Sequence, residues 1–416
     1  MDVLKIATAG SVDDGKSTLI GRLLYDTKSL TDDKLEAIRK SSEKKGYDYL
    51  DFSLATDGLV AEREQGITID VAHIYFSTPN KSYIIADTPG HVEYTRNMVT
   101  GASTSQIAII LIDARKGVIE QTYRHFFINN LLRVKEVIVA INKMDLVNYD
   151  QGVFEDIKTN FEKLNASSTY KNQVLTYIPV SALKGDNVAQ KTEAMSWYEG
   201  DTILEYLENL NANITTTGNT LVRFPVQTVI RPKTKEFHDF RGFAGKIYGG
   251  DLKVGDEITV LPSHTKSTIK EIYFYDKSLK EASTGSAVTI TLNDEVNIAR
   301  GDMLVKQNEL PKIEKSINAT LCWMDNKQLL PGSKYFVQHN TNRVLSKIAT
   351  VKNIISPDFS GSKVSDGKLE LNEIGDVEIK LSKAIFYDSF KDNKANGSFV
   401  LIDEQTNATA AVGFIN

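Results

Sequence analysis

The chain has 416 residues, of which 41% are hydrophobic and 25% are charged, and its formal net charge is −5. The length is enough for about two or three domains, and the composition is that of an ordinary globular protein. The longest apolar run, residues 107–112, is too short to cross a membrane, the first residues lack the pattern of a signal peptide, and the single cysteine, Cys322, excludes a disulfide framework. We therefore expect a cytoplasmic protein without broad affinity for nucleic acid.

The first half of the chain alternates strand-like and helix-like segments. Apolar runs predict strands over residues 4–9, 82–86, 107–113, 136–142 and 176–180. Helical patterns fall over residues 16–25, 94–101, 121–132, 153–164 and 201–209, the last with Asp201 as its cap. Strands separated by helices predict a parallel α/β sheet. Residues 211–219 are polar and β-branched, which indicates a linker.

Residues 31–45 form a further stretch that is charged and helix-prone, with Thr31 or Asp32 as its cap and Gly46 as its stop. On composition alone it is interpreted as a solvated surface helix. The alternative is a segment that docks a partner or senses a bound ligand.

The character of the sequence changes after residue 220. Turn signals recur about every ten residues, at 249–250, 255–256, 262–263, 284–285 and 293–294. This spacing predicts an antiparallel β-barrel, and a break near Pro311 starts another β-rich segment. The predicted architecture is an α/β domain over residues 1–213 followed by two antiparallel β-barrels over residues 214–310 and 311–416.

A phosphate-binding loop is predicted between the first strand and the first helix, where the chain reads Gly-Ser-Val-Asp-Asp-Gly-Lys-Ser. Its glycines let backbone N–H groups approach phosphates, and the helix N-terminus favours the anion. Lys16 should reach the β- and γ-phosphates, and Ser17 should ligate Mg²⁺. The predicted nucleotide-binding residues of this loop are Gly10, Ser11, Val12, Asp13, Asp14, Gly15, Lys16, Ser17 and Thr18.

Two further blocks match the parts of a nucleotide switch. Asp87-Thr-Pro-Gly90 follows a predicted strand, so Asp87 can hold Mg²⁺ through water and Gly90 can meet the γ-phosphate and act as a hinge. Thr68, within Gly-Ile-Thr-Ile at residues 66–69, would complete the Mg²⁺ shell only when the γ-phosphate is present. The predicted metal ligands are therefore Ser17, Thr68 and Asp87.

The block Asn142-Lys143-Met144-Asp145 predicts specificity for guanine. A carboxylate at Asp145 can accept hydrogen bonds from N1–H and the exocyclic N2–H of guanine, a donor pair that adenine lacks. Asn142 can reach the other edge of the base, and the stem of Lys143 can cover its face. After the next strand, the tripeptide Ser181, Ala182 and Leu183 fits a loop whose backbone N–H meets guanine O6.

The predicted catalytic group consists of His91, Lys16 and Thr68. His91 follows the hinge glycine and is the best candidate to position the attacking water. Val12 and Ile67 would flank the same site as an apolar gate. The remaining histidines, at positions 73, 125, 238, 264 and 339, have no motif context and are interpreted as structural.

These four blocks, followed by two β-rich segments, resemble the translation elongation factor superfamily of GTPases. Within it, the chain is most similar to the GTPase subunits of bacterial ATP sulfurylase. Ser11 and Asp14 favour that group, because elongation factors typically carry histidines at these positions. The stretches that carry the closer resemblance are residues 10–24 (GSVDDGKSTLIGRLL), 57–70 (DGLVAEREQGITID), 83–89 (YIIADTP), 94–103 (YTRNMVTGAS), 109–117 (IILIDARKG), 219–232 and 240–245 (FRGFAG).

The resemblance implies a function that the residues alone do not give. Members of this family bind GTP or GDP with Mg²⁺ and form a complex with a smaller catalytic subunit, which makes adenosine 5′-phosphosulfate from ATP and sulfate. GTP hydrolysis on the large subunit drives that uphill step, so ATP and sulfate would bind the partner. The partner complex would be a heterodimer or a higher assembly. A second Gly-x4-Gly-Lys-Ser/Thr motif is absent, so we expect no fused adenylylsulfate kinase.

Two other functions stay open from the sequence. The first is a translational GTPase that carries aminoacyl-tRNA or a release factor, which the acidic net charge and the spelling of the phosphate loop disfavour. The second is a scaffold without GTP turnover, which the full set of site residues disfavours.

Overall fold

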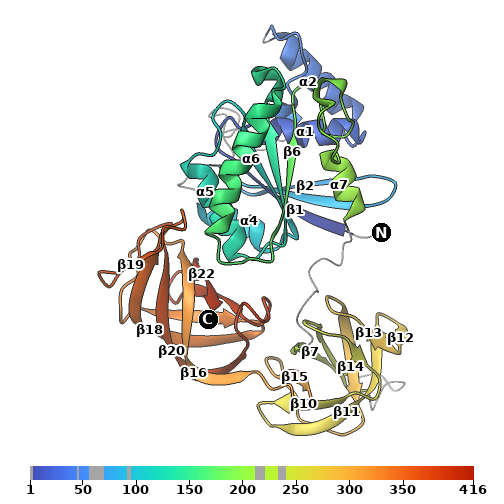
Figure 1. Cartoon of the computed structure of the whole chain (residues 1–416). Coiled ribbons are helices and arrows are strands. Elements are labelled where there is room, and N and C mark those ends of the chain that lie inside the picture. The colour runs from blue at the N-terminus through green and yellow to red at the C-terminus, as the bar shows by residue number, and fades with distance from the viewer. Residues whose placement is uncertain (1–2, 45, 56–69, 91–94, 211–220, 233–239) are drawn as a thin grey trace. The chain divides into compact units, whose positions relative to one another are not determined.

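The computed structural model describes residues 3–44, 46–55, 70–90, 95–210, 221–232 and 240–416. The chain divides into two compact units, one of residues 1–215 with 356–361 and one of residues 216–355 with 362–416. Figure 1 shows a sheet with helices in the first unit and β-barrels in the second. The predicted linker lies outside the described residues, and the domain boundaries predicted after residues 213 and 310 stay predictions.

A six-stranded sheet forms the centre of the first unit, in the order β2-β3-β1-β4-β5-β6. β2 runs antiparallel to β3, and the other neighbouring pairs are parallel. All seven residues of β4 and of β5 are buried, as continuous apolar strands inside a parallel sheet should be. The strands are β1 (Val3–Ala9), β2 (Ala72–Ser77), β3 (Ser82–Asp87), β4 (Ile107–Asp113), β5 (Glu136–Asn142) and β6 (Val174–Pro179).

Helices connect the strands of this sheet and pack on it. Their apolar stripes join the strand side chains in one core, which includes Leu19 and Leu23 of the first helix together with Ile6 and Ile109 of the strands. The helices are α1 (Lys16–Asp26), α2 (Asp32–Lys44), α4 (Thr95–Ser103), α5 (Glu120–Leu131), α6 (Gln151–Ala166) and α7 (Ile203–Asn209), with short 3₁₀ turns η1 (Phe52–Ala55), η3 (Met144–Val147) and η4 (Glu193–Met195).

The first barrel is a closed antiparallel sheet in the order β10-β15-β7-β8-β14-β11, closed by pairing of β10 with β11. Its strands are β7 (Phe224–Ile230), β8 (Gly242–Lys246), β10 (Glu257–Leu261), β11 (Thr265–Phe274), β14 (Ala287–Leu292) and β15 (Met303–Lys306). A short strand, β12 (Lys277–Leu279), pairs antiparallel with β11, and β9 (Leu252–Lys253) pairs with β13 (Glu281–Ala282).

The second barrel closes in the same way, in the order β17-β21-β22-β16-β20-β18 with β17 paired to β18. Side chains along β17 alternate between buried and less buried positions, as expected where one face of a sheet packs on a core. The strands are β16 (Lys312–Trp323), β17 (Lys334–His339), β18 (Asn342–Ile355), β20 (Ile374–Tyr387), β21 (Ser398–Asp403) and β22 (Thr409–Ile415), and β19 (Ser362–Val364) pairs antiparallel with β18.

The predicted fold class, an α/β domain followed by two antiparallel β-barrels, is therefore confirmed. The predicted strands and helices of the first half lie within about two residues of the observed ones, which is the usual uncertainty of element boundaries. The cap of α7 was assigned wrongly. Thr202, not Asp201, caps this helix, because its hydroxyl accepts from the N–H of Glu205 while the Glu205 carboxylate accepts from the N–H of Thr202.

Within the described ranges, no helix has both the length and the apolar character that crossing a membrane requires.

Candidate functional site: the guanine-nucleotide pocket

The parallel strands bring the predicted site residues to one edge of the sheet. Thr8 of β1 is in register with Asp87 of β3, and Asp113 of β4 is in register with Asn142 of β5. The loops that follow these strands therefore emerge side by side at their carboxyl ends. Ligands of parallel α/β sheets bind at this edge.

The phosphate loop follows β1 and ends where α1 begins at Lys16. Gly15 precedes the helix in a left-handed conformation with φ 93°, and a Cβ there would stand 2.5 Å from Nδ2 of Asn142. Glycine is therefore required both by the backbone and by the close approach of the neighbouring loop. Lys16 Nζ donates to the carbonyls of Gly10 at 2.7 Å and Ser11 at 3.3 Å, which curls the side chain over the loop.

The polar groups of this loop are buried but incompletely paired. Asp14 is 2% exposed, and one of its carboxylate oxygens accepts from the N–H of Ser11 at 2.6 Å. The other oxygen of Asp14 and the hydroxyl of Ser11 have no hydrogen-bond partner among the described residues. Burial raises the pKa of Asp14, against the pull of the Ser11 hydrogen bond and of Lys16. Buried unpaired polar atoms fit a loop built to hold a polar ligand.

Lys16 itself is buried beside carboxylates. Burial lowers the pKa of its ammonium group, while Asp87, Asp14 and Asp13 act in the opposite direction. A phosphate chain placed here would add negative charge beside this buried ammonium group and so offset the cost of its burial.

The turn after β3 places the predicted metal ligand and hinge against the phosphate loop. Asp87 is 3% exposed, and one of its carboxylate oxygens accepts from the hydroxyl of Thr8 at 3.0 Å. Gly90 lies so close to the loop that an added Cβ would stand 2.2 Å from the Gly10 carbonyl and 2.8 Å from Lys16 Nζ. The Gly90 carbonyl accepts from the side-chain amide of Gln121 on α5 at 3.0 Å.

The predicted guanine loops are joined by side-chain hydrogen bonds. Asn142 Nδ2 donates to the carbonyl of Asp14 at 2.8 Å, and Asn142 Oδ1 accepts from the N–H of Ala182 at 2.9 Å. The hydroxyl of Ser181 donates to the Asp145 carboxylate at 2.7 Å. This bond fixes one oxygen of Asp145, so that the carboxylate is oriented before a base arrives.

Asp113, at the end of β4, is a member of this site that the sequence did not predict. Its side chain is fully buried, and its carboxylate contacts Nζ of Lys143 at 3.1 Å and Nη2 of Arg115 at 2.6 Å. Burial alone would raise the pKa of Asp113, but the hydrogen bonds from Arg115 and Lys143 outweigh it and hold that pKa below its usual range. Lys143 also donates to the carbonyl of Asp13, so it spans the phosphate and guanine loops.

His125 is a second residue whose place the sequence did not predict. It lies on α5, is 3% exposed, and its Nδ1 has no hydrogen-bond partner among the described residues. Burial, then Lys16 and Arg124, lower the pKa of His125 to about 3, and a hydrogen bond with the Gly90 backbone acts against that shift. The one signal for this arrangement in the sequence is the spacing of Gln121 and His125. They lie one helical turn apart, so both can face the Gly90 backbone.

The structure thus brings together the predicted residues of the phosphate loop, the Asp87–Gly90 turn and both guanine loops. Thr68, His91 and Ile67 lie outside the described residues, so their predicted roles, and the apolar gate with Val12, stay predictions. Ser17 and Thr18 lie in the first turn of α1, and Leu183 lies in the loop after Ala182. Ser17 offers a hydroxyl oxygen and Asp87 offers carboxylate oxygens, and such oxygens are suitable ligands for Mg²⁺.

This arrangement of loops, at the carboxyl ends of a parallel sheet, is that of a P-loop GTPase. Comparison with protein-family models agrees with it. Residues 1–217 match the model of the elongation factor Tu GTP binding domain, and residues 316–416 match the model described as GTP-eEF1A C-terminal domain-like.

Curated relatives resemble the chain over nearly its whole length. It is 46% identical to sulfate adenylyltransferase subunit 1 of Colwellia psychrerythraea, covering 100% of this chain and 88% of the relative. It is 47% identical to the protein of the same name from Cellvibrio japonicus, covering 100% and 86%. It is 45% identical to the bifunctional enzyme CysN/CysC of Mycobacterium tuberculosis, covering 99% of this chain and 67% of that relative. The chain belongs to the sulfate adenylyltransferase subunit 1 family of elongation factor Tu-type GTPases.

Proposed function

We propose that this chain is the GTP-hydrolysing subunit of a sulfate adenylyltransferase. In this role, hydrolysis of GTP to GDP and phosphate is coupled to formation of adenosine 5′-phosphosulfate and pyrophosphate from ATP and sulfate on a partner subunit. The observation that carries the proposal is the 46–47% identity to proteins named sulfate adenylyltransferase subunit 1 along the whole chain. The joined phosphate and guanine loops support it.

The residues at the site take the following roles. Lys16 and the backbone of the phosphate loop hold the β- and γ-phosphates, and Asp145 with the Ser181–Leu183 loop binds guanine. Ser17, Thr68 and Asp87 would hold Mg²⁺, which neutralises charge on the phosphates. His91 positions the attacking water. The Gly90 N–H binds the γ-phosphate, and the turn moves as a hinge when that phosphate leaves.

The partner is a smaller catalytic subunit, in a heterodimer or a higher complex, and the setting is the cytoplasm. The words "subunit 1" in the names of the relatives support a multi-subunit enzyme. ATP and sulfate bind that partner, whereas this chain supplies the free energy of GTP hydrolysis.

The deciding experiment measures the formation of adenosine 5′-phosphosulfate. The enzyme is this chain, co-expressed with the small subunit from the same source. Pyrophosphate release and GTP hydrolysis are followed together, with and without GTP. We expect synthesis that depends on GTP and proceeds alongside hydrolysis. Hydrolysis without any adenosine 5′-phosphosulfate from a verified complex would overturn the proposal, and binding of charged tRNA would then be tested.

A hydrolysis-deficient variant separates GTP binding from energy coupling. His91→Ala should bind GTP as the wild type does, while turnover falls by roughly 10² or more, as for a lost acid–base or positioning group. GTP-dependent synthesis should fall in parallel. His73→Ala, at an exposed position on β2, is the matched control and should leave both activities unchanged. Equal loss of GTP binding by His91→Ala would contradict its role.

A further inference from the structure

Tyr149 stands between the two guanine loops although it belongs to no motif. It follows Asn148, and both residues adopt left-handed backbone conformations, with φ 54° for Asn148 and 55° for Tyr149. Two consecutive non-glycine residues rarely adopt this conformation unless their surroundings impose it. The Tyr149 backbone is held on both sides, because its N–H donates to the carbonyl of Met144 at 2.8 Å and its carbonyl accepts from Trp197 Nε1 at 3.0 Å.

The side chain of Tyr149 makes the connection between the loops. Its hydroxyl donates to the carboxylate of Asp186 at 2.8 Å. The backbone carbonyl of Asp186 accepts from the N–H of Ser181 at 3.1 Å, and the hydroxyl of Ser181 donates to Asp145. Tyr149 therefore contacts the Asn142–Asp145 loop through its backbone and the Ser181–Asp186 loop through its side chain.

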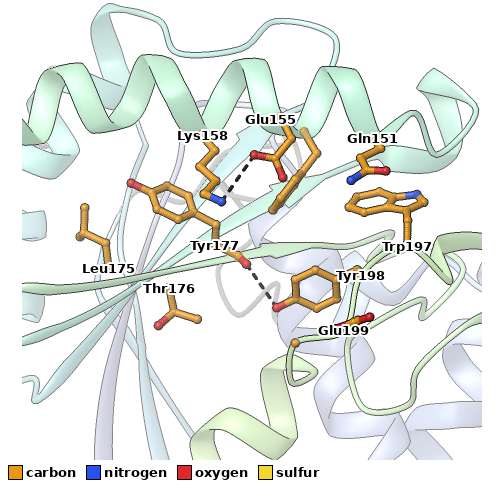
Figure 2. Close-up of a pocket in the computed structure, with 11 residues that line it drawn as sticks. Gln151, Glu155, Lys158, Leu175, Thr176, Tyr177, Trp197, Tyr198 and Glu199 are labelled. Atoms are coloured by element: carbon orange, nitrogen blue, oxygen red, sulfur yellow. Dashed lines mark hydrogen bonds and ion pairs between the residues drawn. The ribbon is translucent and has the colours of Figure 1, made fainter.

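Trp197 holds the backbone of Tyr149 through the hydrogen bond from its indole. Its ring packs against Phe154 of α6, with ring centroids 5.3 Å apart, and against Tyr198 at 6.3 Å. These rings line a cleft of about 440 Å³ at the edge strand β6, where the Tyr198 hydroxyl donates to the carbonyl of Tyr177 (Figure 2). The indole thus rests on neighbouring aromatic rings, and its hydrogen bond holds the Tyr149 carbonyl in place.

We propose that Tyr149 is a positioning residue for guanine recognition, which sets the distance between the Asp145 loop and the Ser181 loop through its hydrogen bond to Asp186. The proposal rests on the guanine-binding role of Asp145 proposed above. Its physical basis is preorganisation: a ligand binds more tightly when the groups that meet it are already held in place. Burial, then the hydrogen bond and charge of Asp186, raise the pKa of Tyr149, so the hydroxyl keeps its proton and continues to donate.

The test compares guanine with hypoxanthine nucleotides in the full chain carrying Tyr149→Phe. Hypoxanthine keeps N1–H and O6 but lacks the exocyclic amine, so inosine 5′-diphosphate makes one bond fewer to Asp145 than GDP does. We expect the Kd of GDP to rise about tenfold, as for loss of one hydrogen bond to a charged group, and the Kd of inosine 5′-diphosphate to rise less than about threefold. The preference for guanine should therefore shrink.

Kinetics and a rescue variant separate positioning from a purely structural role. In Tyr149→Phe, the KM for GTP should rise while kcat at saturating GTP stays within about twofold, because guanine binding weakens equally in the ground state and in the transition state. Asp186→Asn keeps an acceptor oxygen for the hydroxyl and should bind GDP nearly as the wild type does, whereas Asp186→Ala should match Tyr149→Phe. The double variant Tyr149→Phe/Asp186→Ala should bind GDP no more weakly than either single variant, since each single change already removes the same hydrogen bond.

Tyr275→Phe removes the same atom from an exposed tyrosine of the first barrel and should change nothing. An equal loss of affinity for both diphosphates, or unchanged GDP affinity in Tyr149→Phe, would overturn the inference. Asp145→Asn, measured in the same assay, should shift preference toward xanthosine 5′-diphosphate. If the preference of Asp145→Asn does not shift, the proposed guanine site itself is wrong. If it shifts while Tyr149→Phe binds GDP as the wild type does, only the inference about Tyr149 fails.

Discussion

Asn142 and Asp14 are 128 residues apart in sequence, yet the side-chain amide of Asn142 donates to the Asp14 carbonyl at 2.8 Å. The other end of the same amide accepts from the N–H of Ala182 at 2.9 Å. Asn142 is 2% exposed, so these bonds form away from competing water. One side chain therefore holds the phosphate loop and both guanine loops in a fixed relationship, which is the geometry that a nucleotide bound at both ends requires.

Replacing Asn142 by Ala should weaken GDP and GTP binding together. The change leaves the Asp14 carbonyl and the Ala182 N–H without their buried partner, at a cost of about 1–3 kcal/mol each. We expect the Kd of GDP to rise by roughly 10- to 100-fold, measured by calorimetry on the full chain. Asn160→Ala, at an exposed position on α6, is the control and should bind normally. An unchanged Kd in Asn142→Ala would show that the loops hold their places without it.

Gly90→Ala should separate GTP hydrolysis from GDP binding. The added methyl group would stand 2.2 Å from the Gly10 carbonyl and 2.8 Å from Lys16 Nζ, so the turn must move away from the phosphate loop. GTP hydrolysis should fall by roughly 10²-fold, as when one transition-state donor is lost. GDP affinity should change little, because GDP lacks the γ-phosphate that Gly90 is proposed to meet. Hydrolysis at the wild-type rate would refute this role.

The parts of the site that the sequence predicted are those with local signals. A loop between a strand and a helix, rich in glycine and ending in Lys16, is specified by neighbouring residues, and the structure places it as expected. The same holds for Asn142 and Asp145, which end a buried strand. The parallel sheet then follows from the alternation of strands and helices, because parallel strands need such crossovers.

The parts that the sequence did not predict depend on contacts between distant segments. Asp113 reads as the last residue of an apolar strand, and only the register of β4 with β5 places it beside Lys143. Tyr149 and Asp186 carry no pattern that would pair them. The strand β2, which was not predicted, pairs with the edge that β3 offers, and Phe76 is its one buried residue. The cap at Thr202 did have a signal, since Glu205 follows it at the spacing of a capping box.

Arg223 and Asp388 should contribute strongly to the stability of the second unit. Both side chains are almost fully buried, and the guanidinium donates to the carboxylate at 2.8 Å and 2.9 Å in a two-point contact. Arg223→Met leaves a buried carboxylate without its cation, which costs about 3–5 kcal/mol. Urea unfolding, followed by tryptophan fluorescence with Trp197 replaced by Phe throughout, should show a lower midpoint.

The double variant Arg223→Met/Asp388→Leu provides the decisive comparison for this pair. It removes both charges and should recover part of the lost stability, because no unpaired charge stays buried. Lys253→Met, which breaks an exposed pair with Glu281, should leave the urea midpoint nearly unchanged, because water screens exposed charges. If the double variant is less stable than the wild type by the sum of the losses measured in Arg223→Met and in Asp388→Leu, the pair is not coupled as its geometry indicates.

His125 should make the stability of the first unit depend on pH. Its pKa is about 3 in the folded protein, lowered first by burial and then by Lys16 and Arg124, against about 6.5 in an unfolded chain. Between these values the unfolded chain binds a proton that the folded chain refuses. The stabilisation is therefore complete above about pH 6.5 and is lost as pH falls toward 3, at up to about 1.4 kcal/mol per pH unit.

His125→Gln, which cannot titrate, should show a shallower decline in unfolding free energy between about pH 7 and pH 5. His73→Gln, at an exposed position, should keep the wild-type slope. Identical slopes for wild type and His125→Gln would mean that His125 is protonated in the folded protein and that its burial beside Gly90 does not hold it neutral.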